Sequence, residues 1–68
     1  MFSEGEIGVD PILKYFAFEH LPEKLREISR PFCVLAKEIV VNIERSAERT
    51  VALRKLLESK DAAVRAAL

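Results

Sequence analysis

The chain has 68 residues, half of them hydrophobic, and its 11 basic and 11 acidic side chains cancel to a formal net charge of zero. A chain of this length makes at most one small domain, and so high a hydrophobic content excludes a disordered chain. The balanced charge gives no reason to expect bulk attraction to a DNA or RNA polymer, or to an anionic membrane.

The cysteine count and the N-terminal residues indicate the cellular compartment. Cys33 is the one cysteine, so we expect no internal disulfide, no zinc site of the usual Cys/His kind, and a small buried thiol. The start MFSEGEIG lacks the basic and apolar regions of a secretory signal, and no apolar run approaches the ~20 residues that span a bilayer. We therefore expect a soluble, intracellular protein without a metal or cofactor.

The N-terminal part predicts an arm followed by a short helix. Both glycines fall within residues 1–9, which we interpret as a flexible or loosely docked arm. Asp10 followed by Pro11 is a standard helix start, with Asp10 as the N-cap. This helix should run to about His20, whose imidazole would cap the C-terminal end.

Two longer helices should follow. Pro22 opens the second, Pro31 should kink or break it, and the connection ERSA places Ser46 at the N-cap of the third. The apolar stripe of the second helix consists of Leu25, Ile28, Phe32, Leu35, Ile39 and Ile43, and that of the third of Leu53, Leu56, Leu57, Val64 and Ala67. Nothing alternates with the period of a strand. The fold class is therefore all-α, one domain over residues 1–68: a short N-terminal helix followed by a kinked antiparallel helical hairpin.

Each long helix carries a second apolar set outside its stripe. These residues are Val34 and Val41 in the second helix, and Val51, Ala52, Ala62, Ala63 and Ala66 in the third. A hairpin covers one stripe per helix, so the second set predicts a homo-oligomer. The alternative is that scattered surface valines and alanines need no partner.

The aromatic residues of YFAFEHLP divide between two helix faces. At ~100° per residue, Phe16 shares the face of Ile12 and Leu13 and is predicted to be core, whereas Tyr15 and Phe18 lie nearly opposite. Those two rings meet either a subunit interface, which the spacing favours, or a planar ligand. The ligand alternative needs a cation for an anionic group, and Arg30, opposite the apolar stripe, is placed to supply it.

Lys60 is the unusual cation of the third helix, because it falls inside the apolar stripe with no acid at i±4. It either extends its ammonium outward or meets an anion, or an acid of another subunit. Two arginines of this helix have acidic partners at i,i+4: Arg54 with Glu58, and Arg65 with Asp61. The sequence has no glycine-rich phosphate loop and no nucleophile–base pattern, so we do not expect an enzyme.

In two segments, YFAFEHLPEKLREISRPFCVLA and ERTVALRKLLESKDAAVRA, the chain resembles a family of small phage proteins. These are the anti-CBASS cyclic-nucleotide sponges, related to the sponges that antagonise Thoeris defence. The resemblance extends from Tyr15 to Ala66 and rests on the blocks HLPxxLxxxSxPF and ERTxALRKLLExKD. It implies a helical hexamer that sequesters signalling nucleotides in the cytoplasm of the infected bacterial host.

The resemblance also implies two kinds of pocket. Cyclic dinucleotides such as cGAMP would bind between subunits, with Tyr15 stacking on a base, Arg30 contacting a phosphate and Phe18 nearby. Family members often have lysine in place of Arg30, so the preferred phosphate linkage can differ here. Cyclic trinucleotides would occupy a separate pocket, for which the candidates are Arg49, Lys60 and Arg65. The competing hypothesis is a structural helical hairpin that binds a protein partner through Tyr15 and Phe18.

Overall fold

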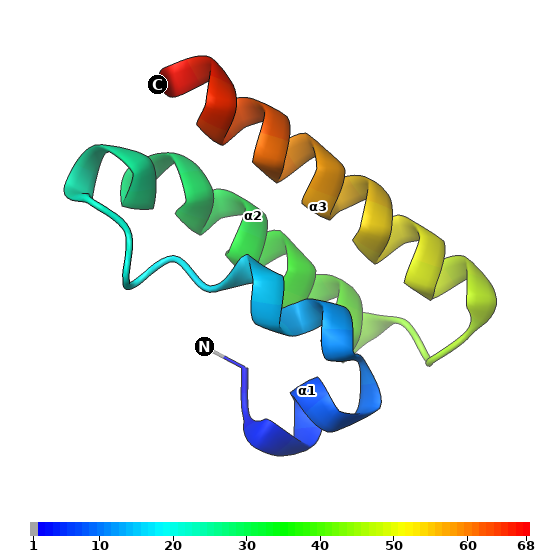
Figure 1. The fold of residues 1–68 in the computed structure, drawn as a ribbon. Coiled ribbons are helices and arrows are strands. Elements are labelled where there is room, and N and C mark those ends of the chain that lie inside the picture. The colour runs from blue at the N-terminus through cyan, green and yellow to red at the C-terminus, as the bar shows by residue number, and fades with distance from the viewer. Residues whose placement is uncertain (1) are drawn as a thin grey trace.

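The structure is a computed structural model that describes residues 2–68, and its regular elements are all helical within that range (Figure 1). In chain order they are α1 (Glu4–Val9), the 3₁₀ helix η1 (Pro11–Phe16), α2 (Glu23–Asn42) and α3 (Ala47–Ala67). Helices α2 and α3 lie side by side as an antiparallel hairpin, and η1 packs against both. The predicted all-α class and the hairpin are confirmed. None of the described helices combines the length and the apolar character needed to cross a membrane.

Helix α1 lies in the segment for which the sequence predicted a flexible or loosely docked arm. Ser3 Oγ accepts a hydrogen bond from the backbone N–H of Glu6 at 3.1 Å, and Glu6 Oε1 accepts one from the N–H of Ser3 at 3.0 Å. This reciprocal pair is a capping box, which satisfies two N–H groups at the helix start. Glu6 Oε2 also lies 2.6 Å from Lys37 Nζ on α2, so α1 is joined to the hairpin.

The next helix is shorter than predicted. It ends at Phe16 instead of near His20, and Asp10 makes no side-chain capping hydrogen bond, because its carboxylate pairs with Arg49. His20 lies in the turn closed by the hydrogen bond from Leu21 N–H to the Phe18 carbonyl, at 3.1 Å. It therefore does not cap a helix.

The boundaries of the hairpin follow the predicted signals. Pro22 is the N-cap of α2, and Ser46 caps α3 by accepting a hydrogen bond from Arg49 N–H at 3.1 Å. Helix α2 runs through Pro31 without a break, and Pro31 itself is exposed. The sequence predicts a kink or a break at this proline: the break is wrong, and the kink stays a prediction.

The core lies where η1 and the segment after it cover the hairpin. Its buried hydrophobic residues are Leu13, Phe16, Phe18, Cys33, Ala36 and Leu53. Phe16 is core, as predicted. Helix α2 contributes small side chains to this core, whereas Leu35, predicted to be buried, is 45% exposed. The buried face of α2 is therefore rotated away from the predicted stripe.

Arg49 joins three parts of the fold from inside. Its Nη1 donates to the carbonyl oxygens of Val40 at 3.3 Å and Ile43 at 2.8 Å, and its Nη2 pairs with the carboxylate of Asp10. The carbonyl of Ile43 follows the last turn of α2, whose own carbonyls lack intrahelical partners. Arg49 thus closes the end of α2 and holds the α1–η1 junction against α3.

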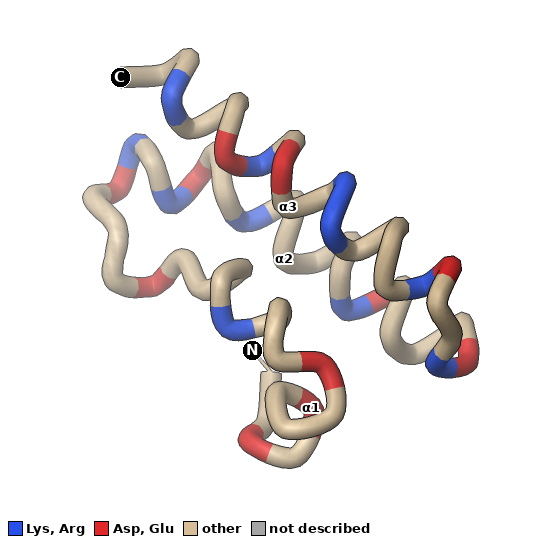
Figure 2. The backbone as a smooth tube through the Cα atoms, turned by 45° about the vertical axis from the view of Figure 1, so that its right-hand side comes forward, with Lys and Arg blue, Asp and Glu red and all other residues tan. Residues whose placement is uncertain are grey.

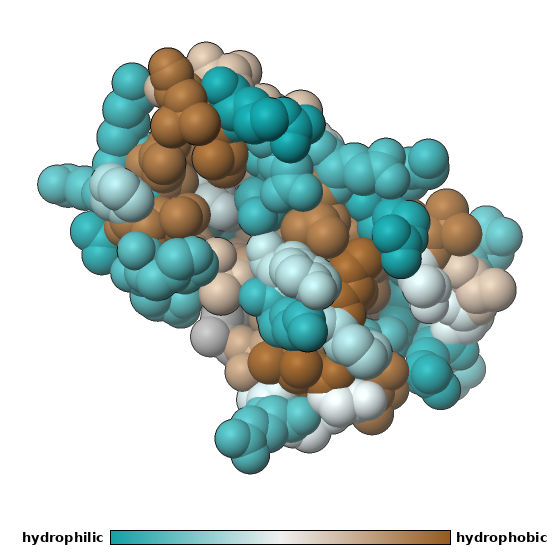
Figure 3. All heavy atoms as spheres, viewed as in Figure 1, coloured by the Kyte–Doolittle hydropathy of each residue, from teal (hydrophilic) through white to brown (hydrophobic). Residues whose placement is uncertain are grey.

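Charged and apolar residues share the remaining surface. Figure 2 shows acidic residues on α1 and both charge signs interspersed along α2 and α3. Figure 3 shows hydrophobic patches among the hydrophilic surface, one of them where α3 ends and α2 begins. The second apolar set is exposed as predicted at Val34, Val41 and Val51. The homo-oligomer inferred from it stays a prediction.

Candidate functional site

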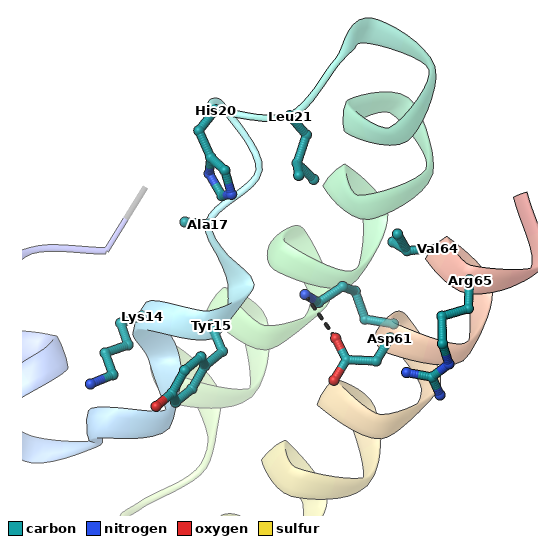
Figure 4. A pocket seen from close by; sticks show the side chains of 9 residues that line it. Lys14, Tyr15, Ala17, His20, Leu21, Asp61, Val64 and Arg65 are labelled. Atoms are coloured by element: carbon teal, nitrogen blue, oxygen red, sulfur yellow. Dashed lines mark ion pairs between the residues drawn. The ribbon is translucent and has the colours of Figure 1, made fainter. Parts of the chain in front are cut away.

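A groove of about 380 Å³ lies between η1, the connection 17–21 and the C-terminal half of α3. Its polar lining consists of Lys14, Tyr15, His20, Lys60, Asp61 and Arg65, and its apolar lining of Ala17, Leu21 and Val64. Figure 4 shows Lys14 and Tyr15 on one side of the opening and the α3 residues on the other. Its volume is at the small end of the ~300–1,000 Å³ range of ligand pockets in proteins.

Tyr15 presents its ring at this groove. The residue is 56% exposed, although the neighbouring Phe16 is fully buried. Lys14 Nζ lies 5.1 Å from the centroid of the Tyr15 ring, within cation–π range. An exposed ring with a cation against it is suited to stacking on a planar ligand that also carries negative charge.

Lys60 is held at the groove with little exposure. Its side chain is 12% exposed, and its Nζ lies 3.0 Å from Asp61 Oδ1, an ion pair drawn in Figure 4. Asp61 thus pairs with Lys60 instead of with Arg65, the partner predicted from the i,i+4 spacing. The second predicted pair is also replaced, because Glu58 lies 3.9 Å from Lys55 Nζ. The sequence left two alternatives for Lys60. Its low exposure and its ion pair with Asp61 do not fit the first of them, an ammonium that extends into solvent.

The groove concentrates positive charge in a chain of zero net charge. Lys14, Lys60 and Arg65 line it against the single carboxylate of Asp61. For Lys14 and Arg65, no ion pair is recorded within residues 2–68. The groove therefore favours an anion.

Phe18 and Arg30 lie together, and neither of them lines the groove. Phe18 is buried in the core, and the guanidinium carbon of Arg30 lies 5.9 Å from the centroid of its ring. Arg30 also pairs with Glu27 on the exposed side of α2. Phe18 does not share the exposure of Tyr15 because the helix stops at Phe16, so the helical spacing no longer relates the two rings.

The three candidates for a second pocket also separate. Lys60 and Arg65 share the groove with Tyr15, whereas Arg49 is 6% exposed and is held inside the fold by Asp10. This geometry gives Arg49 a structural role and leaves it outside the groove that Tyr15 lines. Of the predicted binding residues, the structure brings together Tyr15, Lys60 and Arg65.

Two charged residues of the groove were not predicted as site residues, for a reason that lies in the tertiary fold. Lys14 and Asp61 are far apart in the sequence, and their meeting depends on how η1 packs on α3. A local signal existed for Lys14 alone, since it directly precedes the exposed ring. Asp61 had been assigned to a surface pair with Arg65.

Cys33 is buried in the core and lies outside the groove. Burial raises the pKa of the Cys33 thiol above its ordinary value, so the thiol stays protonated near neutral pH. Within residues 2–68, His, Cys, Asp and Glu side chains form no group of three or more that could hold a metal ion.

Comparison of the chain with protein-family models, curated proteins and solved structures finds no match. The resemblance to the phage sponges therefore stays a prediction that rests on the two sequence segments.

Proposed function

We propose that this protein binds cyclic dinucleotide signals such as cGAMP and sequesters them without degrading them, so that the CBASS-type defence of an infected bacterium is not triggered. The observation that carries the proposal is the exposed ring of Tyr15 at a groove lined by Lys14, Lys60 and Arg65. A nucleotide offers a flat base to the ring and a phosphate to the cations.

The energetics are compatible with sequestration. Stacking contributes ~1–3 kcal/mol per base, and charge-assisted hydrogen bonds to phosphate add to it. A cyclic dinucleotide has two bases and two phosphates, so two copies of one groove suit its twofold symmetry. Two such half-sites are compatible with nanomolar affinity, which needs ~12 kcal/mol, and a sponge must bind this tightly because it only competes for the signal.

A shared ligand requires an assembly, and we propose a homo-oligomer, in line with the hexamer of the resembling family. The exposed valines of α2 and α3 supply apolar surface for it. Arg30 lies outside the groove of its own chain, so in this proposal it contacts the ligand of a neighbouring subunit. Cyclic trinucleotides are a second proposed ligand class. Lys60 and Arg65 are its remaining candidates.

Calorimetric titration of the purified protein against cyclic di- and trinucleotides tests the proposal. We expect submicromolar binding of a cyclic dinucleotide, one ligand for every two chains, and recovery of intact ligand after the complex is heated. Tyr15→Ala should abolish this binding while the assembly, measured by light scattering, persists. Lys24→Ala, an exposed cation outside the groove, is the control. Absence of binding across the panel would refute the proposal.

The exposed apolar residues favour one second candidate, a structural helical hairpin that binds a protein partner. In that case Tyr15→Ala would weaken the partner complex or the assembly and would have no effect on any nucleotide. The same titrations and light-scattering measurements therefore separate the two functions.

A further inference from the structure

We propose that Asp61 is an internal substitute for the ligand phosphate: it neutralises Lys60 while the groove is empty and releases Lys60 to a phosphodiester when a ligand enters. The identity of the ligand rests on the proposed function. The exchange itself rests on the geometry of Lys60, Asp61 and the cations beside them.

The first argument is the burial of Lys60. Its side chain is 12% exposed, and an ammonium on a side chain with so little access to water is unfavourable unless a counter-charge lies beside it. The recorded counter-charge is the Asp61 carboxylate at 3.0 Å. Any ligand that displaces Asp61 must therefore replace its negative charge.

The second argument is the asymmetry of the pair. Asp61 is 46% exposed, so its carboxylate can return to water at little cost, whereas Lys60 cannot. The ammonium has three donors and the carboxylate only accepts. Exchange of the partner of Lys60 then requires rotation of an exposed aspartate side chain and no movement of the helices.

The third argument is the charge of the remaining lining. Lys14 and Arg65 lie on the same groove with no carboxylate recorded against them within residues 2–68. A phosphodiester carries one negative charge. It therefore replaces the one negative charge that Lys60 loses when Asp61 moves away. Phosphomonoesters bring more charge but must still compete with Asp61. The aspartate therefore acts on both affinity and selectivity.

The test uses three probes, inorganic phosphate, adenosine 5′-monophosphate and 3′,3′-cGAMP, with the full chain and its Asp61→Asn variant. Asp61→Asn removes the internal competitor and should tighten binding about fivefold, the scale of a partly exposed ion pair. The gain should be largest for the monoester, because its single phosphate group carries about −1.5 to −2 at pH 7, whereas each phosphodiester of cGAMP carries one negative charge. Glu58→Gln, a carboxylate on the same helix outside the groove, should change binding much less.

Lys60→Met supplies the opposite variant. It should weaken binding of every probe and make the remaining binding less sensitive to salt, because one of the cations that attract the phosphate is gone. Lys60→Arg keeps the charge, so it should retain much of the binding; circular dichroism checks that both variants fold. Unchanged or weaker binding by Asp61→Asn, in a folded protein that binds the probes, would overturn the exchange.

The outcomes also separate this inference from the proposed function. If phosphate and the monoester follow the expected order among the variants while cGAMP does not bind, the exchange stands and the sponge function fails. If cGAMP binds tightly and Asp61→Asn does not tighten it, the sponge stands and the exchange fails. If none of the probes binds, both fail.

Discussion

The guanidinium of Arg49 and the carboxylate of Asp10 form an ion pair in which each side chain is only 6% exposed. The two residues are 39 positions apart in the sequence, so this pair fixes where the α1–η1 junction lies on α3. Arg49 also donates to two carbonyl oxygens at the end of α2. One side chain therefore connects all the parts of the fold that place Tyr15 beside α3.

Removal of one partner of this pair should be strongly destabilising. Arg49→Met leaves the Asp10 carboxylate buried without its partner, and breaking a buried ion pair costs ~3–5 kcal/mol. Urea unfolding followed by circular dichroism measures the loss. The double variant Asp10→Asn with Arg49→Met should recover part of it, because no charge is then left unpaired. A loss below ~1 kcal/mol for the single variant would mean that water reaches the site.

Acid should loosen α1 from the hairpin. The hydrogen bond from Lys37 holds the pKa of Glu6 below its ordinary value of 4.5. A carboxyl group whose folded pKa is lowered contributes stability above its unfolded pKa, and that contribution is lost as pH falls through the folded pKa. Glu6→Gln should therefore reduce the free energy of unfolding at neutral pH, and the difference from wild type should shrink as pH falls below 4.5 and vanish below the folded pKa of Glu6.

The control for this prediction is Glu4→Gln, which removes an exposed carboxylate from the same first turn of α1. It should have a smaller effect on unfolding, since the ion pair that joins α1 to α2 remains. An equal effect of both variants at every pH would indicate a role for helix-dipole charge alone.

The fold was predictable where local signals determine it. The N-caps of α2 and α3 follow from Pro22 and Ser46, and the hairpin follows from the apolar spacing. The start of α1 also had a signal, the capping-box pattern from Ser3 to Glu6, which two nearby glycines obscured. No local signal indicated that η1 is a 3₁₀ helix. A helical wheel with 3.6 residues per turn therefore extended this helix too far and placed Tyr15 and Phe18 on one face.

The site was predictable only in part, for a tertiary reason. Tyr15 could be predicted as a site residue because it cannot share one core with Phe16. Lys60 could be predicted because it is a cation within an apolar stripe. That residues 14–21 face residues 60–65 depends on the close packing of η1 on the hairpin. The same packing explains which face of α2 is buried. The small side chains of Cys33 and Ala36 leave room for the aromatic rings of the core, whereas the larger side chain of Leu35 would not.

This explanation predicts the outcome of enlarging the small core residue. Ala36 is fully buried, so Ala36→Leu forces a larger side chain against the core and should cost ~1–3 kcal/mol. Leu35→Ala, at a half-exposed position one residue away, should cost less in the isolated chain. Urea unfolding of both variants measures the order. The reverse order would indicate that Leu35 is buried in an assembly.

Assembly itself can be tested at Val41, which is 66% exposed on α2 and belongs to the second apolar set. If this set forms the subunit interface, Val41→Lys places an ammonium in an apolar contact and should shift the protein toward monomer in light scattering. Asn42→Lys adds the same charge at an exposed polar neighbour and is the matched control. A Val41→Lys protein that keeps the wild-type mass would exclude this surface as the interface. Loss of both assembly and cGAMP binding would support a ligand site shared between subunits.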